Sequence, residues 1–186
     1  MWLRLHSFME RSRANGPGLR AVVWTQGCSL GCPGCFNPET HVREAGHWVR
    51  VDDLMGQIRE LPPEIEGITI SGGEPLQQFD AVLFLLQRIR RESRFSVLIF
   101  TGFTPDEVQR FPKFEELLTC VDVLIAGRYD QSQRLARGLI ASANKQALLL
   151  TDRYTRADLH AVPEAELIVQ PDGSISISGI DPLTIT

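Results

Sequence analysis

Three of the chain's four cysteines lie in one short stretch at residues 27–37, "GCSLGCPGCFN". Cys28, Cys32 and Cys35 have the spacing C-x3-C-x2-C. An odd number of thiols cannot be consumed by disulfides, and three do not complete a four-thiolate zinc site. The intervening glycines allow the backbone to wrap around a compact centre. The stretch therefore predicts a metal centre with one coordination position left open.

The cysteines alone leave two metals under consideration. Iron–sulfur clusters normally take four thiolates, so three close cysteines leave one iron without a protein ligand unless Cys120 supplies the fourth. A catalytic zinc site also keeps an open position, and His41 and His47 follow the motif closely enough to complete one. A cluster is favoured, because a catalytic zinc site made of cysteines only is unusual. Cys120 stands alone and is expected to be a small apolar residue of the core.

A second candidate element is "SGGEP" at residues 71–75. Its two glycines allow close approach of the backbone to a ligand, and Glu74 adds an acceptor charge. The same residues equally describe a tight turn in which Pro75 opens a helix. Taken alone, "NGPG" at 15–18 is expected to be a turn and "FTGF" at 100–103 an ordinary strand end.

Alternating strands and helices must position these residues. Apolar and β-branched runs predict strands at 20–26, 66–71, 95–102, 121–127 and 146–151. Periodic apolar segments predict helices at 52–60 with Asp52 as N-cap, at 79–92, and after Thr104, which caps a helix opened by Pro105. Asp122, which opens the apolar strand at 121–127, is expected to cap the strand end.

The alternation defines the expected fold class. Apolar strands separated by helices indicate parallel βαβ units in an α/β fold. The strands are too few for an eight-stranded barrel, so we expect a partial (incomplete) βα barrel or open sheet with mostly parallel strands. Ligands bind such sheets at the carboxyl ends of the strands. The cysteine loop, "GGEP" and the Thr101-Gly102 pair should therefore meet at one rim.

The C-terminal part follows a different pattern. Two alternating runs in residues 165–179 flank Pro171-Asp172-Gly173 and predict a β-hairpin. Residues 130–145 are expected to form an exposed loop. We expect a single domain over 1–186, with a core at about 15–151 and the hairpin at about 165–179 as an extension.

Composition narrows the function classes. The 186 residues are 43% hydrophobic and carry a net charge of −4, which suits a globular domain and argues against non-specific nucleic-acid binding. No apolar run approaches the roughly 20 residues of a membrane helix. The mixed, charged N-terminus does not resemble a secretory signal. We therefore expect no nucleic-acid or membrane partner and a cytoplasmic protein with reduced thiols.

The two candidate elements together resemble the radical S-adenosylmethionine enzymes. More narrowly, the chain resembles the small activases of glycyl radical enzymes, above all those of anaerobic ribonucleotide reductase. The similarity covers about the first 150 residues and includes "NGPG" with Arg20, residues 27–37 with Thr40-His41, "SGGEPL" at 71–76, "FTGFTPDEV" at 100–108 and "VDVLIAGRYD" at 121–130.

The resemblance implies a set of site residues. Three irons of a 4Fe-4S cluster would be held by Cys28, Cys32 and Cys35, and the fourth iron would bind the amino and carboxylate groups of S-adenosyl-L-methionine. The cofactor would be lined by Gly34, Cys35 and Phe36. Its amino end would be contacted by Gly72, Gly73 and Glu74. No catalytic acid–base residue is implied.

The resemblance also implies a reaction and partners. A donor such as flavodoxin or ferredoxin would reduce the cluster, S-adenosylmethionine would be cleaved reductively, and the 5′-deoxyadenosyl radical would install a glycyl radical on a partner enzyme. The alternative is a radical S-adenosylmethionine enzyme that modifies a peptide or small molecule. A non-catalytic iron–sulfur or zinc protein is less consistent with "GGEP", because an electron carrier needs no site for a cofactor amine.

Two features depart from the small activases and bear on the partner. Their arginine-glycine-serine-serine-asparagine segment is matched only loosely by "ARGLIASANKQ" at 136–146. The hairpin at 165–179 is additional. It could dock a partner by adding an edge strand, or it could cover the edge of the sheet.

Overall fold

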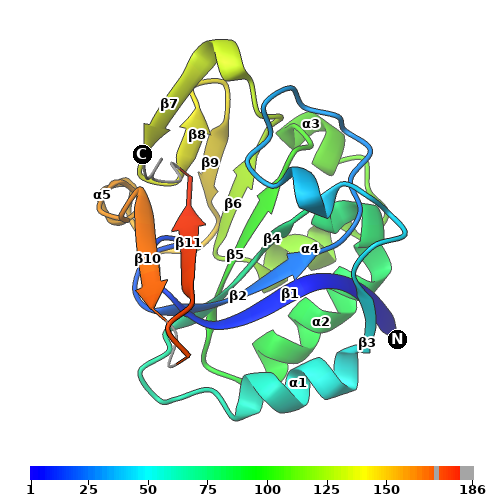
Figure 1. Ribbon diagram of the computed structural model, residues 1–186. Coiled ribbons are helices and arrows are strands. Elements are labelled where there is room, and N and C mark those ends of the chain that lie inside the picture. Colours follow the sequence, from blue (N-terminus) through cyan, green and yellow to red (C-terminus); the bar gives the residue numbers. More distant parts are fainter. Residues whose placement is uncertain (170–171, 181–186) are drawn as a thin grey trace.

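A curved seven-stranded sheet forms the centre of the computed structural model, which describes residues 1–169 and 172–180 (Figure 1). Its strand order is β3-β1-β2-β4-β5-β6-β9. The strands are β1 (Trp2–Ser12), β2 (Arg20–Thr25), β3 (His47–Arg50), β4 (Gly67–Gly72), β5 (Ser96–Thr101), β6 (Val123–Ala126) and β9 (Gln146–Leu149).

The four central strands β2, β4, β5 and β6 are parallel, whereas β1, β3 and β9 add antiparallel edges. Within the described residues β3 and β9 are the two ends of the sheet and do not pair with each other. This arrangement confirms the expected α/β fold with an incomplete barrel. The strand at 146–151 is also confirmed, although it runs antiparallel to β6. The N-terminal β1 and the short β3 were not predicted.

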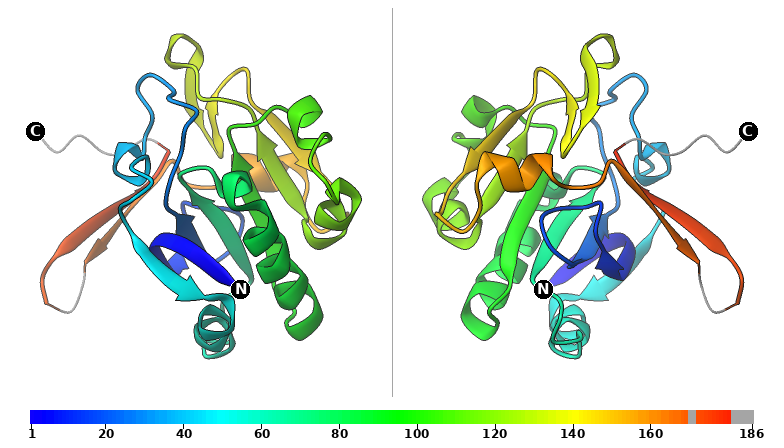
Figure 2. Two further views of the ribbon diagram at one scale, coloured as in Figure 1. Left: turned by 90° about the vertical axis from the view of Figure 1, so that its right-hand side faces the viewer. Right: turned by 90° about the vertical axis from the view of Figure 1, so that its left-hand side faces the viewer.

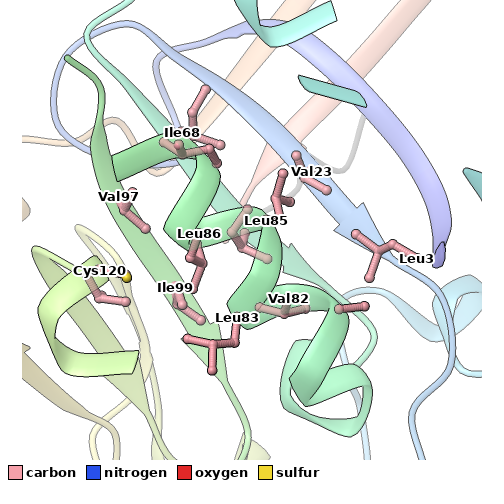
Figure 3. Close-up of a cluster of buried hydrophobic side chains, with 14 of the residues drawn as sticks. Leu3, Val23, Ile68, Val82, Leu83, Leu85, Leu86, Val97, Ile99 and Cys120 are labelled. Atoms are coloured by element: carbon pink, nitrogen blue, oxygen red, sulfur yellow. The ribbon is translucent and has the colours of Figure 1, made fainter. Parts of the chain in front are cut away.

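Three helices cover the outer face of the sheet, namely α1 (Val51–Arg59), α2 (Phe79–Glu92) and α4 (Phe114–Cys120) (Figure 1). Alternate side chains of the strands point toward these helices, because successive residues of a strand face opposite sides. Figure 3 shows Val23, Ile68 and Ile99 packed against Leu85 and Leu86 of α2. Cys120 lies in this core and is 5% exposed, which confirms its expected role as a small apolar residue.

The inner face of the sheet carries a buried charge at the amino ends of the strands. Arg20 is fully buried, and its Nε donates to Thr69 Oγ1 at 2.8 Å. Its Nη1 donates to Ser96 Oγ at 2.8 Å and to Tyr154 Oη at 3.1 Å. Burial lowers the pKa of Arg20, but its hydrogen-bond partners satisfy the guanidinium. Arg20 thus fills the interior at this end, away from the carboxyl ends of the strands.

Of two N-cap residues predicted from the sequence, one is confirmed by the structure and the other is wrong. Thr104 caps α3 (Pro105–Val108) in a capping box with Glu107, as predicted. The N-cap of α1 is Arg50 without a side-chain bond, so the expectation for Asp52 was wrong. Asp52 lies in the first turn, where its charge is favourable to the helix dipole. The remaining helices are α5 (Arg156–His160) and the 3-10 turns η1 (Pro38–Thr40), η2 (Pro75–Gln78) and η3 (Gln131–Gln133).

The expectation of an exposed loop at 130–145 was right about the exposure of residues 131–135 and 137 but wrong about the loop. After η3 the chain forms two short antiparallel strands, β7 (Arg134–Arg137) and β8 (Ile140–Ser142), with a register shift between them. Leu139 and Ser142 are buried, and Leu139 packs in a second apolar cluster on the inner face with Leu98 and Leu159. These short strands lack a long apolar alternation, and they are stabilised by tertiary contacts that a local pattern does not contain.

The predicted C-terminal hairpin is confirmed as β10 (Ala165–Val169) paired antiparallel with β11 (Ile175–Gly179). The first part of its expected turn, with Pro171, lies outside the described residues. Among the described strands, β10 and β11 form a sheet of their own and extend neither edge of the central sheet. Figure 2 shows this hairpin projecting from the body. No described helix is long and apolar enough to cross a membrane.

Candidate functional site

A cavity of about 480 Å³ opens at the carboxyl ends of the parallel strands. This volume lies in the range of small-molecule sites. The expected convergence at one rim is confirmed, since the cavity is lined by residues of the cysteine loop, the "SGGEP" turn and the end of β5: Cys28, Cys32, Cys35, Phe36, Ser71, Gly72, Gly73, Glu74, Thr101 and Gly102. Parallel strands place their carboxyl ends on one edge, which is why these distant segments meet.

The two glycines of the turn allow it to lie directly against the start of the cysteine loop. A Cβ on Gly72 would collide with the backbone of Thr25, and Gly72 has a φ of +108°. A Cβ on Gly73 would collide with the carbonyl of Gly27 and lie 2.9 Å from that of Thr40. Gly73 N donates to Thr25 O at 2.9 Å. Both glycines are thus required by close backbone approach.

Glu74 connects the turn to the neighbouring strand. Its Oε1 accepts from Leu76 N at 2.9 Å and from Thr101 Oγ1 at 2.7 Å, and its Oε2 accepts from Gly102 N at 2.6 Å. Burial raises the pKa of this carboxyl, whereas these hydrogen bonds act in the opposite direction. Glu74 therefore holds the ends of β4 and β5 together while also lining the cavity.

The cysteine loop is held at its base by backbone hydrogen bonds. Gly27 N donates to Thr40 O at 2.8 Å, and Cys28 N donates to His41 O at 3.1 Å. The Gln77 side chain adds a second attachment, accepting from Ser29 N at 3.2 Å and donating to Ser29 Oγ at 2.6 Å. The loop that carries the thiols is thus fixed to η2, directly after the "GGEP" turn.

All three thiols of the loop are free, partly buried and face the same cavity. Burial raises the pKa of Cys28 and of Cys35. Negative charge on Cys32 also raises the pKa of Cys28 and of Cys35. A metal cation bound among the thiols would instead favour their deprotonated form, since cysteines bind metals as thiolates.

The donor set fits a 4Fe-4S cluster better than a zinc ion. In residues 1–169 and 172–180, no three His, Cys, Asp or Glu side chains are arranged to share one metal ion. Neither His41 nor His47 lines the cavity, so the geometry does not support the zinc alternative that would use them. A cluster needs thiolates around a larger inorganic core, and three thiols that line one cavity without meeting at a point suit it.

Steric contacts and backbone conformation explain why a glycine precedes Cys35. Gly34 has a φ of +70°, and a Cβ there would lie 2.8 Å from Gln131 Oε1. Phe36, after the third cysteine, packs against Tyr129 with ring centroids 4.6 Å apart. Both aromatic residues line the cavity. The cysteine loop and the segment after β6 therefore meet at the cavity through these two rings.

Lys145 and Tyr129 line the cavity but were missed by sequence reasoning. Lys145 precedes β9, and its Nζ donates to Gly127 O. Burial lowers the pKa of Lys145, and the negative charges of Cys32 and Glu74 oppose that shift. Lys145 thus brings positive charge to a cavity whose lining also includes the three thiols and the carboxyls of Glu39 and Glu74. The only sequence signal was its place in the loosely matched segment 136–146.

Asp122 and Arg128, which lie in the segment 121–130 that the resemblance includes, both have protein partners. Asp122 Oδ2 accepts from Val97 N at 2.7 Å and its Oδ1 accepts from Thr151 Oγ1 at 2.8 Å, so it caps the strand end as expected. Arg128 donates to both carboxylate oxygens of Glu107, at 2.6 and 3.0 Å. Neither Asp122 nor Arg128 lines the cavity.

The Glu107–Arg128 pair gives a pH-dependent prediction. The hydrogen bond from Arg128 lowers the pKa of Glu107 from 4.5 to about 2. A depressed carboxyl pKa stabilises the folded state above the unfolded pKa, and this contribution is lost as the pH falls from 4.5 through about 2. Glu107→Gln should therefore lower the free energy of unfolding at pH 6, with the difference from the wild type vanishing near pH 2. The effect should be small, because the pair is partly exposed.

Urea titrations of both proteins between pH 2 and 7 would measure this difference. Glu115→Gln changes the net charge by the same amount and serves as the control. A Glu107→Gln deficit that stays constant down to pH 2 would contradict the assignment.

Fold and site together define an α/β protein whose thiol-rich loop and glycine-rich turn share one cavity at the strand ends. Residues 14–149 match the family model of the 4Fe-4S single cluster domain. The chain belongs to this family and, as the sequence predicted, to the radical S-adenosylmethionine superfamily, whose cofactors are a 4Fe-4S cluster and S-adenosylmethionine.

Curated relatives agree with this assignment. The chain is 32% identical over 127 residues to the pyruvate formate-lyase-activating enzyme of Staphylococcus aureus strains USA300, NCTC 8325 / PS 47 and N315, a match that covers 65% of this chain and 51% of each relative. The chain thus spans about half the length of these relatives. A crystal structure of QueE from Escherichia coli matches with a TM-score of 0.46 and 19% identity, over 56% of this chain and 54% of that one.

Proposed function

We propose that the protein cleaves S-adenosylmethionine reductively and uses the resulting radical to activate a glycyl radical enzyme in the cytoplasm. The observation that carries the proposal is the single cavity in which three thiols of one loop face the "GGEP" turn. The similarity to pyruvate formate-lyase-activating enzymes supports the activase type. Modification of a peptide or small molecule would use the same cavity and remains the alternative.

Within this proposal three irons of the cluster would be held by Cys28, Cys32 and Cys35. When bound, the cluster would supply the one-electron reduction that cleaves S-adenosylmethionine, with reduced flavodoxin or ferredoxin as the electron donor. Glu74 is hydrogen-bonded to Thr101 and Gly102. Gly73 and Glu74 would position the methionine part of the cofactor. Gly72 would complete that contact.

The part of the cavity lined by Phe36 would hold the adenosyl part of the cofactor. Phe36, which follows Gly34 and Cys35 in the chain, supplies an apolar ring, and Tyr129 packs against that ring. These residues orient the cofactor and exclude water, whereas the cofactors carry the chemistry. The radical would then take a hydrogen atom from the α-carbon of a glycine in the partner, leaving 5′-deoxyadenosine and a glycyl radical. No acid–base residue is needed for this transfer.

The test measures two products in sequence. Anaerobically reconstituted protein is mixed with dithionite and S-adenosylmethionine, and 5′-deoxyadenosine is quantified by chromatography. The glycyl radical enzyme of the source organism is then added, and the organic radical is measured by electron paramagnetic resonance. We expect both signals. A protein with a full cluster that forms no 5′-deoxyadenosine would refute the radical chemistry, and 5′-deoxyadenosine without a glycyl radical would favour the alternative substrate class.

A further inference from the structure

The C-terminal hairpin presents one apolar face to solvent. In its antiparallel register Leu167 pairs with Ile177 and Val169 pairs with Ile175. Residues paired in this way lie on the same face of a two-stranded sheet. Their exposed fractions are 44% and 36% for the first pair and 65% and 57% for the second. We call these four side chains the hairpin apolar face.

The opposite face of the hairpin attaches it to the body. Glu166 accepts hydrogen bonds from the backbone N of Arg13 at 2.8 Å and from Ser12 Oγ. Ser178 Oγ accepts from Asn15 Nδ2 at 2.7 Å. These polar contacts join β10 and β11 to the segment between β1 and β2. Attachment of the hairpin thus uses its polar face and leaves the apolar face available.

The hairpin apolar face is continuous with the cofactor cavity. Strand β11 runs along the cavity, and residues 176–180 contribute to its lining. Ile177 belongs both to that lining and to the hairpin apolar face. Figure 2 shows the hairpin extending outward from the body of the protein. A protein segment that enters the cavity past β11 would therefore place the surface next to it against the hairpin.

We propose that the hairpin apolar face is the docking surface for the partner enzyme, and that it contacts an uncharged apolar surface beside the reactive glycine of that enzyme. This inference rests on the proposed function. A large substrate protein must be held while one of its segments reaches the cavity, whereas a small-molecule substrate would need the cavity alone. Exposed apolar patches of this kind mark protein–protein contacts. The four side chains carry no charge, so the matching surface is apolar.

Two charge-paired variants test the proposal without disturbing the hairpin. Val169→Lys with Ile175→Glu, and Val169→Glu with Ile175→Lys, each place opposite charges across the strands, which preserves cross-strand pairing. Neither residue lines the cavity. The control is Trp48→Ser on β3, which removes an apolar side chain as exposed as Ile175, 57%, from an edge of the central sheet. Far-ultraviolet circular dichroism and thermal unfolding check that each variant is folded.

The measurements separate docking from cofactor chemistry. With dithionite as the reductant and no partner, all variants should form 5′-deoxyadenosine at the wild-type rate. With the glycyl radical enzyme of the source organism present, both hairpin variants should bind it at least about tenfold more weakly by interferometry and give a correspondingly lower radical yield. The Trp48→Ser control should behave like the wild type. A loss in only one charge order would also contradict an apolar contact.

Other outcomes would overturn the proposal. Wild-type affinity in both hairpin variants would show that the face does not contact the partner. Slower 5′-deoxyadenosine formation without the partner would assign the hairpin to the cofactor site. A wild-type dimer in sedimentation that becomes monomeric in both variants would assign the face to a second copy of the chain. Failure of the wild type itself to form 5′-deoxyadenosine would instead refute the proposed function.

Discussion

Cys32→Ala is expected to abolish cluster binding and with it all formation of 5′-deoxyadenosine. Cys32 is the middle thiol of the loop and faces the cavity with Cys28 and Cys35. With two thiols left in the loop, two irons would have no protein ligand. The fourth cysteine of the chain, Cys120, cannot replace Cys32, because it is buried in the core between the sheet and the helices. We expect the iron content to fall to near zero and 5′-deoxyadenosine to fall to background.

The matched control is Cys120→Ala, which removes a thiol of the same size outside the cavity. This substitution deletes one buried sulfur from the core and should cost about 1 kcal/mol of stability. Its iron content and cleavage rate should remain those of the wild type. Iron and sulfide assays with the ultraviolet–visible spectrum after anaerobic reconstitution report on both variants. Full iron in Cys32→Ala, or lost iron in Cys120→Ala, would show that the ligands are assigned wrongly.

Gly73→Ala is expected to have the second largest effect, because the new Cβ would meet the backbone of two other segments. It would overlap the carbonyl of Gly27 and crowd that of Thr40, neither of which can move like a flexible side chain. The substitution should separate the "GGEP" turn from the cysteine loop and cost about 2–3 kcal/mol of stability. It should also weaken S-adenosylmethionine binding, since both sides of the cavity depend on this contact.

Gly56→Ala is the control for adding a methyl group to a glycine. A Cβ on Gly56 would meet no atom within 4 Å, and this glycine lies in helix α1. Because alanine favours helix, the control should gain about 0.5–1 kcal/mol. Urea unfolding measures stability, and calorimetry with the reconstituted proteins measures S-adenosylmethionine binding. Gly73→Ala with wild-type stability and binding would mean that the turn and the loop need no such close approach.

The sequence by itself determined the kind of metal centre that this protein can bind. Cys28, Cys32 and Cys35 predicted a metal centre with an open position, because thiols at this spacing on a glycine-rich loop are already a local ligand set. Long periodic elements were equally predictable. The helix expected at 79–92 is α2, and its apolar residues face the core as their spacing requires. The parallel strands followed from apolar runs between helices, so the meeting of loop and turn at one rim could be predicted as well.

Only the tertiary structure decided which further residues complete the cavity. Lys145, Tyr129 and Ile177 lie far from the three cysteines in the chain, and no local spacing relates them to the cysteines. Their positions depend on β7, β8 and the hairpin, whose short strands are stabilised by contacts between segments rather than by their own propensity. Glu74 shows the same limit. Its place in "GGEP" suggested a ligand contact, but only the fold revealed that its oxygens also join β4 to β5.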